Sequence, residues 1–379
     1  MNMQNMMDLP EHLIVSILTL LPVKSLLHFK SVSKYWFSLI SDPNFATWHF
    51  ENDAAQSNRL LYFLPPFIYD SQARCIHLDS SLHTHSDHAV INANFLRPTY
   101  SNIKGSCRGF LLILHHDSYL YLWNPSTGVY TQLSLFPINS SNVYAFNPNS
   151  FYGFGYDASR DEYLVVVLTS CDPEDGLKTY QFVEDFETNT GFFSLKTNEW
   201  NNIEDTHLPP YINAFGGVGK LLNDTIHWLV LRRDVPKNII LAFDLMKKSF
   251  SEVPFPAEDF NIKPGCCDLC VLGGLLSLCV KGNNVIDIWV MKEYNVLSSW
   301  TKSIVVSVDE LPIKSHYFYP VCSTKNGDIV GINGGKWLMK CNAKGQVIEH
   351  YMYCADPHGC EAGFYRESLF PLAVNIGQA

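Results

Sequence analysis

A unit of about 50 residues recurs along most of the chain, and this repeat constrains the fold more than any other feature. Each copy has a turn with glycine, an apolar strand, a second strand that ends in an aromatic corner, and one more strand. The copies run from Gly109 to Asn124, from Gly219 to Asp244, from Gly274 to Trp289 and from Gly327 to Asn342, with a stretched copy between Tyr152 and Trp200. Four strands in about 45 residues is the period of a propeller blade.

The segments of this repeat are short and rich in aromatic and β-branched residues, which predicts an all-β domain. Five or six blades fit into residues 59–372. A β-sandwich is the alternative, because short strands separated by regular turns also build that fold. A propeller must join its last blade to its first. Residues 367–374 form a short apolar run, and we predict that they pair beside the early strand at residues 59–63.

The N-terminal segment has a different pattern, that of short helices. Asp8 and Pro10 give a helix-start signal, apolar residues follow at helical spacing, and Pro22 ends the first helix. Two further short helices are predicted before Ile40. Eighteen of the thirty-two residues from Leu9 to Ile40 are apolar, more than so small a unit can bury around its own centre. The surplus indicates a surface that binds a partner.

The same segment resembles an F-box, through Leu9-Pro10, Ile17-Leu18, Leu21-Pro22-Val23 and Lys34-Tyr35-Trp36, closing with Asp42-Pro43 and Phe45. F-box segments bind the adaptor Skp1 and so join a cullin-containing ubiquitin ligase. The residues that this resemblance assigns to Skp1 binding are Leu9, Pro10, Ile14, Ile17, Leu18, Leu21, Pro22, Val23, Leu26, Phe29, Val32 and Trp36.

The rest of the chain resembles the plant F-box-associated domain with its kelch-like repeats. The resemblance rests on Gly105-Ser-Cys-Arg-Gly109, Leu122-Trp-Asn-Pro-Ser-Thr-Gly128, Phe154-Gly-Tyr-Asp157 and Tyr365-Arg-Glu-Ser-Leu369. It implies an α+β chain, with a small three-helix F-box at residues 8–50 and a large kelch-like β-propeller domain at residues 51–379. It also implies the substrate-recognition subunit of a Skp1–cullin–F-box ubiquitin ligase, which holds a target protein for ubiquitination. A Skp1-binding scaffold without ligase function, or a propeller enzyme, are the alternatives.

The composition limits the classes of partner and the cell compartment that we expect for this chain. The net charge is −10 and basic residues come only in short pairs, so we expect no nucleic-acid partner. No signal peptide and no apolar run of membrane-spanning length is visible, so we expect a cytoplasmic or nuclear protein without membrane insertion. Its eleven cysteines are then expected to be reduced thiols.

No pattern predicts an active site, a metal site or a cofactor. Cys267 and Cys270 form a CxxC pair with no second pair at matching spacing, so buried strand thiols are the better interpretation. His83, His85 and His88 lie in a polar stretch that we interpret as a loop. The segment at residues 215–220 lacks two residues of a phosphate-binding loop and is interpreted as a turn.

Target binding is expected at loops on one face of the propeller, because the strands are committed to packing. The long candidates are residues 136–151, 171–180, 204–215 and 315–319. Their aromatic and acidic side chains predict a target surface of basic character. The residues that we assign to target binding are Tyr144, Phe146, Asp172, Glu174, Asp175, Tyr211 and Phe318.

Overall fold

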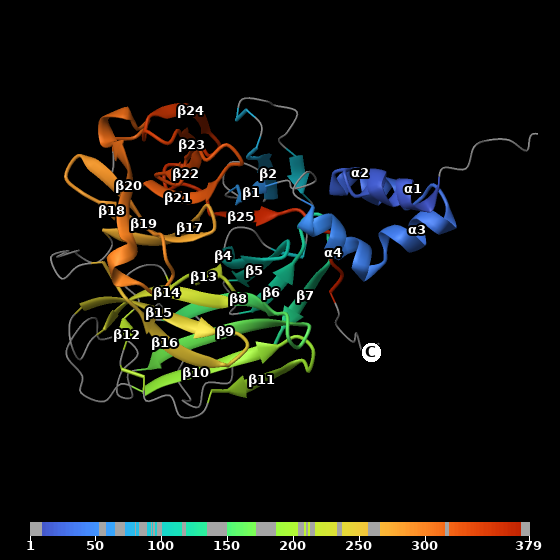
Figure 1. The fold of residues 1–379 in the computed structure, drawn as a ribbon, viewed down its shortest axis with the longest axis horizontal. Helices are drawn as coiled ribbons and strands as arrows, with labels where there is room; N and C mark the ends of the chain where they lie inside the picture. Colours follow the sequence, from blue (N-terminus) through green and yellow to red (C-terminus); the bar gives the residue numbers. More distant parts are fainter. Residues whose placement is uncertain are drawn as a thin grey trace, which may run out of the picture.

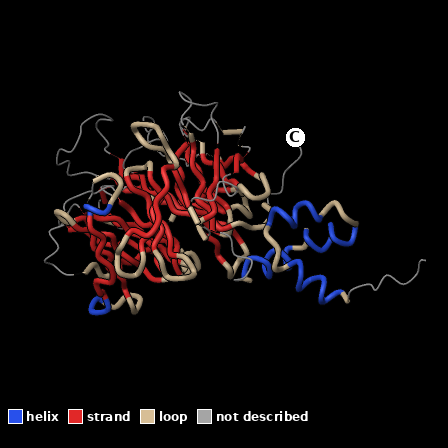
Figure 2. The backbone as a smooth tube through the Cα atoms, turned by 90° about the horizontal axis from the view of Figure 1, so that it is seen from above, coloured by secondary structure: helices blue, strands red, loops and turns tan. Residues whose placement is uncertain are grey.

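The computed structural model shows four helices at one end of a body made of strands (Figures 1 and 2). It describes residues 10–52, 58–64, 73–79, 81–82, 89–91, 93, 95–96, 101–115, 119–134, 150–171, 187–203, 208–209, 211–212, 217–232, 237–256, 266–314 and 318–372.

The helices are α1 (Glu11–Leu18), α2 (Val23–Phe29), α3 (Lys34–Ile40) and α4 (Pro43–Glu51). Prolines precede α1 and α2, at positions where a missing N–H costs nothing. The Ser33 side chain caps α3 by accepting the N–H of Trp36, and Asp42 caps α4 by accepting the N–H of Asn44. The structure thus adds a fourth helix to the predicted three, and the Asp42-Pro43 pair is its start signal.

The strands form six separate sheets, which we number as blades in chain order. Blade 1 contains β25 (Ala362–Arg366), β1 (Asn58–Phe63), β2 (Ala73–His77) and β3 (Ala89–Ile91). Blade 2 contains β4 (Ser101–Cys107), β5 (Phe110–His115), β6 (Leu120–Trp123) and β7 (Tyr130–Leu133). Blade 3 contains β8 (Ser150–Asp157), β9 (Glu162–Cys171), β10 (Glu187–Ser194) and β11 (Glu199–Asn202).

Blades 4 to 6 form the second half of the propeller. Blade 4 contains β12 (Tyr211–Ile212), β13 (Lys220–Leu222), β14 (Thr225–Arg232), β15 (Lys237–Asp244) and β16 (Ser249–Val253). Blade 5 contains β17 (Cys267–Leu272), β18 (Leu275–Lys281), β19 (Val285–Met291) and β20 (Trp300–Ser307). Blade 6 contains β21 (Phe318–Ser323), β22 (Ile329–Asn333), β23 (Trp337–Cys341) and β24 (Val347–Met352). Short 3-10 helices η4 (Leu297–Ser299) and η5 (Val308–Glu310) flank β20.

The first strands of the blades form a closed ring around one axis. β25 lies against β4, β4 against β8, β8 against β13, β13 against β17, β17 against β21, and β21 against β25. Six sheets in such a ring are a six-bladed β-propeller, so the predicted propeller is confirmed and the β-sandwich alternative is wrong. The predicted range of five or six blades resolves to six.

The predicted corners are visible as side-chain turns at the ends of third strands. The Oδ1 atom of Asn124 accepts the N–H of Ser126 at 3.0 Å, and Oδ1 of Asp244 accepts the N–H of Met246 at 3.0 Å. Oδ1 of Asn342 accepts the N–H of Lys344 at 2.9 Å. Asn and Asp occur here because their short side chains can replace a backbone acceptor in a tight turn.

The ring is closed by a different segment from the one predicted. β25, at Ala362–Arg366, pairs antiparallel with β1, with Tyr365 opposite Arg59. Residues 367–374 were predicted for this role because they are more apolar. Pro371 interrupts that run, and Leu369 and Phe370 lie instead in a core shared with the helices.

One disulfide contradicts the prediction that all eleven cysteines are reduced. Cys354 and Cys360 are joined, with their Cα atoms 6.0 Å apart, in the connection between β24 and β25. That connection lies against the turn between β22 and β23, with the N–H of Cys360 donating to the carbonyl oxygen of Gly335 at 2.9 Å. The separation of six residues between these two cysteines in the sequence did not predict their pairing. Eight other described cysteines are free thiols, and all of them except Cys266 are buried.

Candidate functional site

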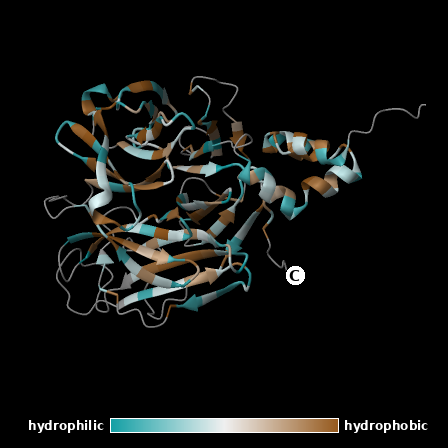
Figure 3. Ribbon diagram, in the orientation of Figure 1, coloured by the Kyte–Doolittle hydropathy of each residue, from teal (hydrophilic) through white to brown (hydrophobic). Residues whose placement is uncertain are grey.

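The helices expose an unusual number of large apolar side chains. Hydrophobic residues, brown in Figure 3, occur along these helices. Ile17 on α1 is 49% exposed, Val32 between α2 and α3 is 61% exposed, and Phe37 on α3 is 57% exposed. An apolar surface of this kind on so small a unit marks a binding surface. We call it the helical apolar face; its members are Leu13, Ile17, Leu20, Val32, Tyr35, Phe37 and Trp48.

The residues predicted to bind Skp1 fall into three groups. Ile17, Val32, Pro10 and Pro22 are exposed. Ile14, Leu21, Phe29 and Trp36 are half-buried, and the rings of Phe29 and Trp36 meet edge to face at 5.3 Å. Leu18, Val23 and Leu26 are buried, at 2% exposure or less, and so support the helices from within. Leu9 lies outside the described residues. Five members of the helical apolar face were not predicted, although their helical spacing from the predicted residues was a usable signal: Leu13, Leu20, Tyr35, Phe37 and Trp48.

The helices are mounted on the propeller through the segment that follows β25. We call residues 367–372 the C-terminal strap. Leu369 and Phe370 of the strap belong to one apolar core with Leu26 of α2 and Phe45 of α4. The same core includes Phe110 of blade 2, so it continues from the helices through the strap into the propeller.

Aromatic and cationic side chains reinforce this junction. The rings of Phe50, at the end of α4, and Phe370 lie 5.3 Å apart. The guanidinium of Arg366 lies 4.0 Å from the centre of the Phe50 ring. On the propeller side, the guanidinium of Arg108 lies between two rings, 4.0 Å from Phe370 and 3.9 Å from Tyr156.

Hydrogen bonds fix the strap in register on blade 2. The Nδ2 atom of Asn124 donates to the carbonyl oxygen of Ser368 at 3.2 Å, and Oγ of Ser368 donates to the carbonyl oxygen of Arg108 at 2.9 Å. Gly109 has a φ of +85°, and a Cβ atom there would lie 2.0 Å from Ser368 Oγ. Only glycine lets the strap approach this turn so closely.

Two polar contacts hold the end of α4 against the end of α1. The Nε2 atom of His49 lies 2.8 Å from the carbonyl oxygen of Leu21, and Nδ2 of Asn52 donates to the carbonyl oxygen of Thr19 at 3.3 Å. Burial, together with the charge of Arg366, lowers the pKa of His49, although the Leu21 carbonyl acts in the opposite direction. The ring is therefore neutral at pH 7 and donates through Nε2.

The two faces of the propeller differ in their connections. The face beside the helices, which we call the helix face, carries tight turns such as Arg108–Gly109 and Gly273–Gly274. Because strands alternate in direction within a blade, the long connections β7–β8, β9–β10, β11–β12 and β16–β17 all begin and end on the opposite face, which we call the loop face. The four segments predicted to bind a target overlap connections whose flanking strands end and begin on this face.

Two of the predicted target-binding residues are placed differently by the structure. Tyr211 in β12 is 2% exposed and Phe318 in β21 is fully buried, so both belong to the core. Assigning them to a target contact was wrong, because an aromatic residue next to a loop can equally be the first inward residue of a strand. Tyr144, Phe146, Asp172, Glu174 and Asp175 lie outside the described residues.

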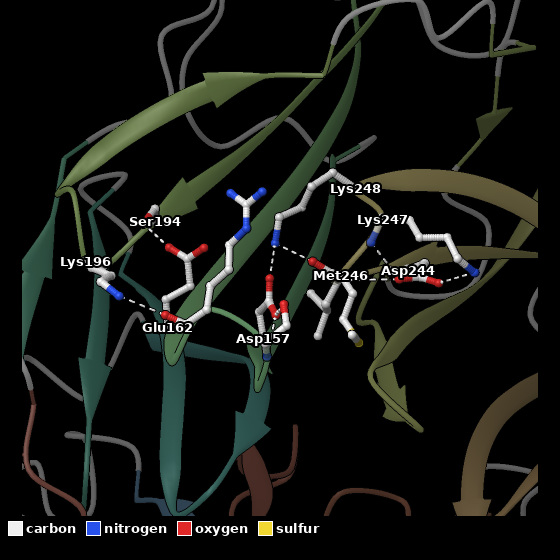
Figure 4. A network of polar contacts seen from close by, with 11 residues as sticks. Asp157, Glu162, Ser194, Lys196, Asp244, Met246, Lys247 and Lys248 are labelled. Atoms are coloured by element: carbon white, nitrogen blue, oxygen red, sulfur yellow. Dashed lines mark hydrogen bonds and ion pairs between the residues drawn. The ribbon is translucent and has the colours of Figure 1, made fainter.

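A network of charges on the helix face joins blades 3 and 4 (Figure 4). Nζ of Lys248 lies 2.7 Å from Oδ2 of the buried Asp157 and also contacts the carbonyl oxygen of Leu245. Burial alone would raise the pKa of Asp157, but hydrogen bonds from Lys248 and Ser159 outweigh it and hold that pKa below its usual range. Asp157 and Lys248 are paired with each other, which is the arrangement of a structural link between blades.

Cys267 and Cys270 are part of the core, whereas His83, His85 and His88 lie outside the described residues. Burial raises the pKa of Cys270 to about 12, and its thiol donates to the carbonyl oxygen of Ser277. Within the described ranges, no group of three or more His, Cys, Asp or Glu side chains could hold a metal ion. No helix in the described part of the chain is long and apolar enough to cross a membrane.

Comparison with known proteins gives two matches along the chain. Residues 6–48 match the F-box domain, and residues 68–356 match the F-box associated beta propeller domain. The F-box protein CPR1 of Arabidopsis thaliana is 29% identical over 335 residues, which cover 85% of this chain and 78% of that protein. An F-box/kelch-repeat protein of the same plant is also 29% identical, covering 79% of each chain. The kelch-like character of the repeats stays a prediction.

Proposed function

Because the chain belongs to the family of F-box proteins with an F-box-associated β-propeller, we propose that it is the substrate-recognition subunit of a Skp1–cullin–F-box ubiquitin ligase. Its F-box binds a Skp1-like adaptor, and its propeller holds a target protein. Its contribution to ubiquitin transfer is proximity, since the reaction itself belongs to other subunits. We propose domain bounds of residues 8–50 for the F-box and 51–379 for the propeller domain.

The helical apolar face is the observation that carries this proposal. It lies within the residues that match the F-box, whereas the buried Leu26 of α2 and Phe45 of α4 pack in the core that the strap shares with the propeller. Its large side chains are exposed although a single domain would gain free energy by burying them. An adaptor that covers them supplies that burial.

The test of adaptor binding is a pair of matched substitutions. Ile17 on α1 and Ile348 on β24 are equally exposed, at 49% and 48%. Ile17→Asp places a charge in the proposed interface and should weaken Skp1 capture by at least about 30-fold, the equivalent of about 2 kcal/mol. Ile348→Asp should leave capture unchanged. Equal capture by both variants, measured by surface plasmon resonance with purified Skp1, would refute the proposed interface.

Ligase membership needs a separate experiment. Affinity purification of the full chain should recover a cullin together with the adaptor, and the Ile17→Asp variant should lose both. Recovery of the adaptor without a cullin would instead favour the scaffold alternative.

We place target binding on the loop face and expect a target surface of basic character. Support comes from the long connections that share this face and from the acidic residues within them. Reversing the charges of Asp172, Glu174 and Asp175 to lysine should weaken target capture while Skp1 capture stays intact. Glu293→Lys, an exposed residue between β19 and β20, is the control. A triple variant that still depletes its target at the normal rate in cells would contradict this assignment.

A further inference from the structure

We propose that the C-terminal strap sets the orientation of the F-box relative to the loop face, with Arg108, Ser368 and Phe370 as positioning residues. This inference deepens the proposed function and rests on it, because orientation matters only if the propeller presents a target to the ligase. The strap follows the last strand of the propeller, and its first residue, Glu367, pairs with Arg59 of β1 at 3.1 Å.

The covalent connection between the two parts does not fix their angle. α4 ends at Glu51 and β1 begins at Asn58, so one short stretch of chain joins them. A single connection limits the separation of two bodies but leaves their relative rotation free. A second, noncovalent attachment is needed to fix the orientation, and the strap supplies it.

The strap is held on both sides. Toward the propeller, Ser368 bonds to Arg108 and is bonded by Asn124, and these bonds allow one register along blade 2. Toward the helices, Phe370 meets Phe50 of α4 at 5.3 Å. The guanidinium of Arg108 lies 4.0 Å from the centre of the Phe370 ring, so that ring contacts both a propeller residue and an F-box residue.

Burial shows that this attachment is tight. Ser368 is fully buried, and Leu369 and Phe370 are each 6% exposed. Side chains packed to this degree have one arrangement, because protein interiors leave little empty volume. Polar contacts of His49 and Asn52 link the end of α4 to the end of α1, and α1 carries part of the helical apolar face.

The functional consequence concerns which lysines receive ubiquitin. A target held at the loop face lies at a distance and angle from the ligase that the F-box orientation determines. Transfer by proximity requires that reacting groups meet in a suitable geometry. A loosened strap should therefore leave both binding steps intact and spread the transfer over more lysines.

The direct test measures the distance between the two parts in the full chain bound to Skp1. Spin labels at the exposed positions Asn44 of α4 and Ser303 of β20 report that distance by double electron–electron resonance. The wild-type chain should give one narrow distance distribution. Phe370→Ala should broaden it at least about two-fold. Phe250→Ala, which removes one ring of the Phe243–Phe250 pair in blade 4, is the matched control and should leave it narrow.

A second variant keeps the proposal testable if Phe370→Ala folds poorly. Gly109→Ala disturbs the contact between the strap and blade 2, because the new Cβ atom would clash with Ser368. Unchanged, narrow distributions in the folded members of this pair would overturn the proposal. Broadening by Phe250→Ala equal to that by Phe370→Ala would also overturn it, because the effect would then be one of general stability.

The transfer step gives an independent reading. In a reconstituted ligase, mass spectrometry of self-ubiquitination should find more modified propeller lysines in Phe370→Ala than in the wild type, with Skp1 affinity unchanged. If the wild type shows no ubiquitination, the proposed ligase function fails while the distance measurement still decides the role of the strap. An identical pattern of modified lysines in both chains, despite a broadened distance, would refute the link between orientation and transfer.

Discussion

His227 should make the propeller sensitive to mild acid. It lies in β14 with no exposed surface, its Nε2 atom 2.7 Å from the hydroxyl oxygen of Tyr294 and its Nδ1 atom 3.3 Å from the carbonyl oxygen of Lys220. The neutral ring satisfies both contacts, donating from Nδ1 and accepting at Nε2. Burial lowers its pKa to about 4, although the carbonyl oxygen of Lys220 acts against this.

The sign and size of the effect follow from the two pKa values. In the unfolded chain this histidine binds a proton with a pKa of about 6.5, and in the folded chain it does so only near 4. Its contribution to stability is therefore complete above about pH 6.5 and is lost as the pH falls toward 4. At pH 5, which is about 1.5 units below the unfolded pKa, the loss is about 2 kcal/mol at about 1.4 kcal/mol per unit.

The measurement compares the wild type with His227→Gln, whose amide can keep both contacts without titrating. Urea unfolding followed by tryptophan fluorescence gives the free energy of unfolding at pH 7 and at pH 5. Between these values the wild type should lose about 2 kcal/mol more than the variant. Contributions of His49 and of the carboxylates are common to both chains and cancel. Equal losses in the two chains would refute a buried neutral His227.

Three further outcomes are expected. Lys248→Met should destabilise the protein by about 3–5 kcal/mol in urea unfolding, because it leaves Asp157 charged and buried; Asp157→Asn should cost less, since Lys248 reaches solvent, and the reverse order would contradict this. Gly331→Ala should lower the melting temperature, because its Cβ would lie 2.3 Å from the buried Phe318 ring, and Phe318→Leu should restore part of the loss. A chain ending at residue 361 should aggregate in light scattering, because the edge of β1 is then unpaired; a soluble monomer would argue against closure by β25.

The repeat can be predicted from the sequence because its turns require particular residue types. Asn124, Asp244 and Asn342 lie at corners that only a few side chains can form, so they mark the blades in the sequence itself. The F-box helices were readable for a similar reason, since Pro10, Pro22 and the caps define their starts. Local rules of this kind need no knowledge of distant residues.

The details that failed depend on distant residues. The choice between residues 362–366 and 367–374 for the closing strand depends on Tyr365, which packs in a core between blades 1 and 2, and on the strap, which packs in the core shared with the helices. Tyr211 and Phe318 looked like surface aromatics because burial is decided by neighbouring blades. Apolar content alone does not distinguish these cases, and neither did the spacing of Cys354 and Cys360.

Closure by the last strand has a consequence for synthesis of the chain. β1 is made near the beginning of translation and its partner β25 near the end. About 300 residues separate Arg59 from Tyr365, with which it pairs. At about 5–20 residues per second, translation of that interval takes about 15–60 seconds. Throughout it the nascent first blade has three strands and an unpaired inner edge. We therefore expect chaperones or the nearby ribosome to keep that edge from pairing with another polypeptide until β25 is made.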